Sequence, residues 1–129
     1  MVQKLAWVFG IVLLAVGVLG FVPGITNDML LLGIFHVDMM HNIVHIVSGL
    51  AALAAAWGMY SARLYFQVFG VIYGAVAVLG FVTGGALLFE TNMADNLLHV
   101  VIAAAALYAG FMMKTETVAT APMGMGATM

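Results

Sequence analysis

The chain has 129 residues, of which 66% are hydrophobic and 6% are charged. Globular domains carry about a quarter charged residues, so this composition excludes an ordinary water-soluble surface. The 3 lysine and arginine residues are too few for the basic patch that nucleic-acid binding needs. The absence of cysteine excludes disulfides, zinc–thiolate sites and thiol nucleophiles. We therefore expect an integral membrane protein.

Four segments are long and apolar enough to form membrane helices, which need about 20 apolar residues. In chain order they are residues 5–22, 39–60, 64–83 and 94–113. Pro23-Gly24 ends the first segment, and Gly84-Gly85 ends the third. The runs are continuous rather than alternating, which argues against a closed β-barrel. The predicted fold class is an all-α membrane protein in which four transmembrane helices form an up-down bundle.

The cations predict the orientation of these helices. Lys4, Arg63 and Lys114 fall on one side of the membrane if four helices cross it, and the positive-inside rule makes that side cytoplasmic. Both termini are then cytoplasmic, and the protein is expected in the cytoplasmic (inner) membrane. The first segment has one lysine before it and no A-x-A cleavage site after it, so we expect a retained helix rather than a signal peptide.

The sequence contains an internal repeat. Residues 8–22 align with residues 68–82 with 10 identities in 15 positions, and residues 35–53 align with residues 89–107 with 8 in 19. This predicts a transmembrane domain over residues 1–114, built from two tandem helical hairpins at about 1–60 and 61–114. Because each hairpin has two spans, both enter the membrane in the same direction, and helix 1 is expected diagonal to helix 3. Small residues permit close helix approach, and the candidates in these spans are Gly10, Gly17, Gly49, Gly70, Gly74 and the alanines at 103–106.

Polar residues gather at the start of the second and fourth helices, on the side opposite the cations. Asp38 and Asn92 occupy aligned positions and are predicted to cap these helices. Asp95 lies three residues after Asn92, where a carboxylate complements the helix dipole and can bond back to the cap. Capping leaves the pairs Asn42/His45 and Asn96/His99 unexplained. Each pair is spaced i, i+3, on one helix face and at membrane depth.

Three interpretations of these pairs remain open. The preferred one is a structural polar network of Asn42, His45, Asn96 and His99 that joins helices 2 and 4 and needs no cofactor. The second is a cofactor site: His45 and His99 as axial ligands of a haem, or a divalent metal bound by His41, His45, Asp95 and His99. The third is a transport path past the two asparagines, disfavoured because helices 1 and 3 contribute little that is polar besides Gln67.

Residues 115–129 form a low-complexity, methionine-rich tail with no apolar periodicity. We expect this tail to be flexible or bound to a partner.

Several motifs resemble a known family. They are GVLGFVPG at 17–24, LLGIFHVDMMHNIVHIVSGLAAL at 31–53, FGVIYGAVAVLGFV at 69–82 and DNLLHV at 95–100. Together they resemble the small membrane-protein family catalogued as domain of unknown function 4383. The resemblance implies a four-helix bacterial inner-membrane protein and supplies no activity. The methionine-rich tail lies outside the family's pattern.

No serine–histidine–acid or paired-carboxylate arrangement lies at membrane depth, so no enzymatic activity is expected. Small size and short loops favour a non-enzymatic accessory or structural subunit of a larger membrane complex. The alternatives are a haem- or metal-binding protein for electron transfer or sensing, and a small transporter or channel. Expected partners are membrane lipids and other membrane subunits, with pigments or self-association as further options and no nucleic acid.

Overall fold

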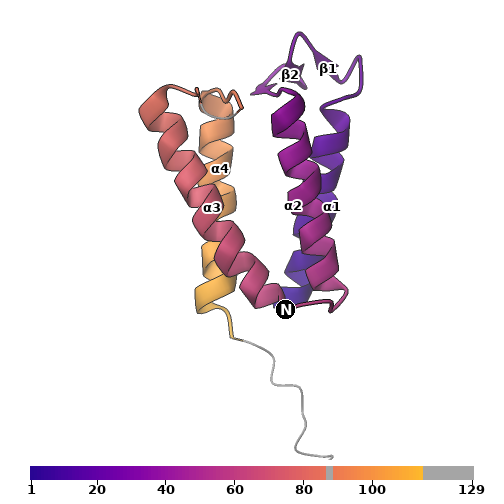
Figure 1. The fold of residues 1–129 in the computed structure, drawn as a ribbon, viewed down its shortest axis with the longest axis vertical. Helices are drawn as coiled ribbons and strands as arrows, with labels where there is room; N and C mark the ends of the chain where they lie inside the picture. Colours follow the sequence, from indigo (N-terminus) through magenta and orange to yellow (C-terminus); the bar gives the residue numbers. More distant parts are fainter. Residues whose placement is uncertain (87–88, 115–129) are drawn as a thin grey trace, which may run out of the picture.

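A computed structural model describes residues 1–86 and 89–114. It contains the helices α1 (Val2–Leu19), α2 (Met39–Ala56), α3 (Ala62–Thr83) and α4 (Met93–Leu107), and α4 continues as the π-helical turn η1 (Tyr108–Met112). All four helices are long and apolar enough to cross a membrane (Figure 1). The predicted all-α membrane fold is confirmed. The predicted tail, residues 115–129, lies outside the described residues.

The helix ends differ from the predicted segments by a few residues. α1 ends at Leu19, three residues before the predicted end, and α2 ends at Ala56 rather than at residue 60. Apolar residues continue past both ends, so hydropathy alone places these two ends too late in the chain. α1 also begins three residues before the predicted start, at Val2, so its length of 18 residues equals that of the predicted segment. Ser61 caps α3 by accepting a hydrogen bond from the amide of Leu64, which places the start of α3 at Ala62.

A small antiparallel sheet, which hydropathy did not predict, joins α1 to α2. Its strands β1 (Thr26–Asn27), β2 (Leu30–Leu31) and β3 (Phe35–His36) are in the order β1-β2-β3. We call the membrane side with this sheet and the start of α4 the loop face. The opposite side, where the N-terminus and the end of α4 lie, is the terminal face (Figure 1).

The helices form two hairpins, with α1 packed along α2 and α3 packed along α4 (Figure 1). Glycine makes the close approach possible at matching positions of the two hairpins. A Cβ atom on Gly10 would lie 2.6 Å from Leu53, and one on Gly70 would lie 2.9 Å from Leu107. Gly49 of α2 lies against the backbone of α1, since a Cβ atom there would be 2.6 Å from the Leu14 nitrogen. Gly74 differs, since its nearest neighbour would be 4.0 Å away.

The two hairpins meet through aromatic rings in the half of the bundle toward the terminal face. Phe9 of α1 makes edge-to-face contacts with Phe66 and Phe69 of α3, with ring centroids 5.0 and 5.9 Å apart. Helices 1 and 3 are therefore in direct contact, and their side chains fill the centre of this half of the bundle.

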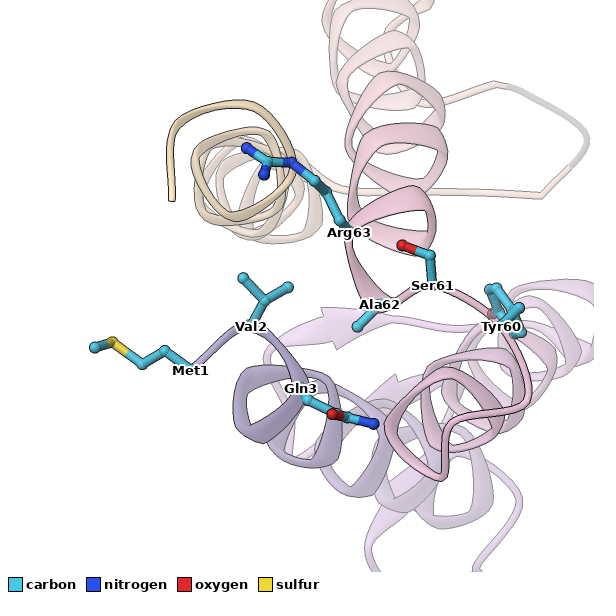
Figure 2. A pocket seen from close by; sticks show the side chains of 7 residues that line it. All are labelled: Met1, Val2, Gln3, Tyr60, Ser61, Ala62 and Arg63. Carbon is cyan, nitrogen blue, oxygen red and sulfur yellow. The ribbon is translucent and has the colours of Figure 1, made fainter. Parts of the chain in front are cut away.

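At the terminal face, side chains at the start of α1 and α3 bind the last turns of α2 and η1. Gln3 donates to the carbonyl of Ala56. Arg63 donates to the carbonyls of Gly110 and Met113, which lie in the last turn of η1 and just after it, where helix carbonyls lack helical partners. Figure 2 shows Arg63 reaching toward the end of α4, beside a hollow of about 240 Å³ between the starts of α1 and α3. The guanidinium of Arg63 thus joins the start of α3 to the end of the α4–η1 helix within the second hairpin.

Candidate metal centre

Two helix caps fix the starts of α2 and α4 at the loop face. Asp38 Oδ1 accepts a hydrogen bond of 2.7 Å from the amide of His41. Asn92 Oδ1 accepts from the amide of Asp95, whose Oδ2 accepts in return from the amide of Asn92, which completes a capping box. These are the positions at which the sequence predicted caps, and they set which side chains of the following turns face the interior.

Asp38 also reaches across to the second hairpin, since its Oδ2 accepts from the amide of Glu90 at 2.8 Å. Partial burial raises the pKa of Asp38, but the hydrogen bonds from the Glu90 and His41 amides and the nearby His41 and His36 rings outweigh this effect. The pKa of the carboxyl therefore lies below its usual value. The ionised form of Asp38 is the one that joins the hairpins.

Three histidines converge beneath these caps. His41 and His45 lie one turn apart on α2, and His99 faces them from α4. Their side chains are 1%, 5% and 2% exposed. One ring nitrogen from each lies within 4.8 Å of the others. The fold thus brings together three of the four residues predicted as metal ligands.

Most nitrogens of this cluster have no hydrogen-bond partner. Among buried side-chain atoms of the described residues, the unpartnered ones include His41 Nε2, both ring nitrogens of His45 and His99 Nδ1. Buried polar atoms normally have a partner, and leaving one without a partner costs about 1–3 kcal/mol. Neutral imidazole nitrogens of this kind are the groups that coordinate transition metals.

A chain of hydrogen bonds orients His41. Its Nδ1 lies 3.0 Å from the carbonyl oxygen of His36, and because a carbonyl only accepts, Nδ1 carries the proton. The lone pair of His41 is then on Nε2, the unpartnered atom. The amide of His36 in turn donates to Asp95 Oδ2 at 3.0 Å. Metal-binding histidines usually donate their second ring nitrogen to a carbonyl or carboxylate in this way.

Asp95 therefore has a different role from the predicted one of metal ligand. It was expected as a metal ligand, but it is not part of the group of nearby ligand atoms, which contains histidines alone. Its Oδ2 accepts from the amides of His36 and Asn92. The i, i+4 spacing does place Asp95 and His99 on one side of α4, but the capping box turns the carboxylate toward the helix start.

Two aromatic side chains that the sequence analysis did not select form walls of the cluster. Phe89 stacks on His41 with ring centroids 4.9 Å apart, and Tyr73 of α3 meets His99 edge-to-face at 5.6 Å. The hydroxyl of Tyr73 donates to Ser48 Oγ at 3.3 Å. Helix α3 thus contributes a polar group at membrane depth in addition to Gln67, where the sequence led us to expect little that is polar. Tyr73 could have been selected from the sequence, because it is a tyrosine among the apolar residues of a membrane helix.

The asparagines lie apart from the histidines. Asn42 and Asn96 are 3% and 4% exposed. Their Oδ1 atoms occupy the spaces left by the missing side chains of Gly20 and Gly80, at 1.9 and 2.1 Å from where a Cβ atom would be. Each asparagine thus packs within its own hairpin.

The predicted structural network is therefore not formed as expected. Asn96 Oδ1 accepts from the hydroxyl of Thr91 at 3.0 Å. Within the described part of the chain, no hydrogen bond joins Asn42 or Asn96 to a histidine of the cluster. The close approach of helices within each hairpin keeps the asparagines at the glycines.

The predicted bis-histidine haem does not fit this arrangement. The His45 and His99 rings lie 6.2 Å apart, and the His41 ring lies 4.6 and 5.6 Å from them. A porphyrin plane between His45 and His99 would need the space that His41 occupies. A single ion needs no such space, so the geometry favours a metal ion over a haem.

Comparison with known proteins gives the family. The family model described as a domain of unknown function (DUF4383) matches residues 3–112, a range that includes nearly all of the four helices. No curated protein and no solved structure matches the chain. Because the match covers most of the chain, this four-helix membrane protein belongs to the family known as domain of unknown function 4383.

Proposed function

We propose that this protein is a small membrane metalloprotein that holds one transition-metal ion on His41, His45 and His99. The supporting observation is that three buried imidazoles present ring nitrogens within 4.8 Å of one another, while four of their nitrogens have no hydrogen-bond partner. Histidine at membrane depth is expensive without such a partner and marks functional sites.

The donor set indicates which ions the site would take. Imidazole suits zinc, copper, iron and nickel, whereas calcium and magnesium require several oxygen ligands. Three histidine ligands leave one position of a tetrahedral ion open, as in catalytic zinc sites. Two ligands come from the first hairpin and one from the second. A bound ion would therefore fasten the hairpins together near the loop face, in a site suited to sensing or electron transfer.

The test is metal binding by the full-length protein in mild detergent. The purified protein would be stripped with a chelator and titrated separately with Zn²⁺, Co²⁺ and Cu²⁺. Bound metal would be measured by elemental mass spectrometry, and the ligand geometry by the visible spectrum of Co²⁺. We expect about one ion per chain and a tetrahedral Co²⁺ spectrum.

His45→Leu is the most informative variant because neither ring nitrogen of His45 has a hydrogen-bond partner to lose. We expect it to weaken binding by more than the about 10–100-fold that second-shell changes cause. His36→Gln is the matched control, since the hydrogen bond from His41 to His36 uses the backbone carbonyl of His36, which this substitution keeps. Binding that His45→Leu leaves unchanged, or the absence of any binding, would overturn the proposal.

The accessory-subunit prediction is a second proposal, compatible with the first. It is supported by the apolar outer surface of the hairpins, which fits lipid and membrane partners alike. On this surface Val8, Val47, Val68 and Val101 are 55%, 59%, 51% and 63% exposed. Purification from the native membrane in mild detergent would test it by intact-complex mass spectrometry. Stoichiometric co-elution with a larger complex is the expected result, and recovery of the protein alone would contradict it.

A further inference from the structure

Apolar grooves run along both seams between the hairpins, in the half of the bundle nearer the terminal face. One lies between α2 and α3 and has a volume of about 300 Å³. The other lies between α1 and α4 and consists of two hollows of about 460 and 130 Å³, both lined by Val8. Aligned positions of the sequence repeat line both grooves, including Val8 in one and Val68 in the other.

The grooves differ in charge. Lys4 lines the α1/α4 groove at the terminal face, and the aligned residue of the α2/α3 groove is Leu64. Lysine can lay its methylene chain along an apolar wall and keep its ammonium group at the membrane surface. α1 also begins without a side-chain cap, so the positive end of its dipole adds to the charge of Lys4.

The grooves differ in shape as well. In the α2/α3 groove, Tyr65 donates its hydroxyl to the carbonyl of Ser48, and Tyr60 donates to the carbonyl of Ala51. The Tyr65 bond joins α3 to α2 across that seam, and Tyr60, in the loop between these helices, bonds back to α2. Leu5 takes the place of Tyr65 in the α1/α4 groove and forms no such tie. The larger hollow of the α1/α4 groove has a volume of about 460 Å³, against about 300 Å³ for the α2/α3 groove.

We propose that the α1/α4 groove binds an acyl chain of an anionic phospholipid from the leaflet at the terminal face, with the lipid phosphate paired to Lys4. A groove between membrane-spanning helices is surrounded by hydrocarbon, so acyl chains are the molecules available to fill it. Lys4 selects the anionic headgroup, and the α2/α3 groove, which has leucine at that position, lacks this selectivity. This site is separate from the histidine cluster, which lies toward the other face.

Intact-protein mass spectrometry of the full-length protein would test the proposal, with phosphatidylglycerol and phosphatidylcholine of identical chains as probes. We expect one phosphatidylglycerol to be retained about fivefold more strongly than phosphatidylcholine, because one lysine near an anionic surface contributes about 1 kcal/mol. Lys4→Gln should abolish this preference while leaving chain binding in place.

Val8→Phe and Val68→Phe form a matched pair of groove-filling variants at half-exposed positions. Val8→Phe should remove the retained lipid, and Val68→Phe should leave it. Thermal unfolding of each variant identifies any general loss of structure, and Lys4→Gln tests the headgroup contact independently of groove shape. Equal retention of both lipids by the unchanged protein, retention unaffected by Val8→Phe, or a dimer that excludes lipid would each overturn the proposal.

Discussion

His36 and Glu90 pair across the junction of the two hairpins, with Nε2 of His36 3.3 Å from Oε2 of Glu90. They occupy aligned positions of the sequence repeat, one at the end of β3 and the other just before α4. Their backbone amides are also bound by the opposite hairpin: His36 donates to Asp95 and Glu90 donates to Asp38. Carboxylate–amide bonds therefore join the hairpins above the histidine cluster.

The side-chain pair and the carboxylate–amide bonds should contribute unequally to stability. Glu90 is 68% exposed, and exposed ion pairs contribute at most about 1 kcal/mol, so Glu90→Gln should lower the free energy of unfolding by less than that. Asp95→Ala leaves the His36 and Asn92 amides without their acceptor and should cost about 1–3 kcal/mol or more. Equilibrium unfolding in detergent would measure both, and a larger effect of Glu90→Gln would contradict this ranking.

The same carboxylate should tune metal binding without coordinating the ion. Asp95→Asn weakens the acceptor for the His36 amide and loosens the peptide that orients His41. Metal affinity should fall about 10–100-fold while the number of bound ions stays unchanged. Thr91→Val removes a neighbouring hydrogen bond to Asn96 outside this chain of contacts and should leave affinity as it is. Equal affinities for the Asp95→Asn variant and the unchanged protein would count against a positioning role.

Two glycine-to-alanine substitutions should affect stability differently, because Gly49 lies at a helix contact and Gly74 does not. In Gly49→Ala the new Cβ would lie 2.6 Å from the Leu14 nitrogen, so α1 and α2 must move apart, at a cost of about 1–3 kcal/mol. In Gly74→Ala the nearest atom would be 4.0 Å away. That variant should be neutral or more stable by up to about 1 kcal/mol, because alanine favours helix. Thermal unfolding would compare them, and equal destabilisation would disprove the assigned contact.

Asp38 should make stability depend on pH in the acid range. Its pKa is lowered in the folded protein, so its contribution is fully present above the pKa of the unfolded chain, about 3.9. The contribution is lost as the pH falls through the lower folded pKa. Asp38→Asn keeps a good helix cap and removes the titration. The stability difference between the two proteins should therefore be constant above about pH 5 and shrink below about pH 4. A difference that does not change with pH would contradict this assignment.

Some features of the site follow from local sequence and were predictable. The caps Asp38 and Asn92 act on amides three residues away, and the i, i+4 spacing of His41 and His45 places them on one helix face. The β1–β2–β3 sheet was missed because its strands have two residues each, too short for an alternating pattern to register.

By itself, the sequence determined four apolar spans and the caps of α2 and α4, because hydropathy and helix capping depend on residues that are neighbours in the chain. Only the tertiary structure decided that His99 meets His41 and His45, that Asp95 holds a peptide instead of an ion, and that the asparagines lie against glycines. Contacts such as the one from His36 to Asp95 join residues 59 positions apart. Such contacts depend on how the two hairpins pack together. Hydropathy does not decide this packing, because surfaces of small apolar residues can pack against each other in several ways that bury similar apolar area.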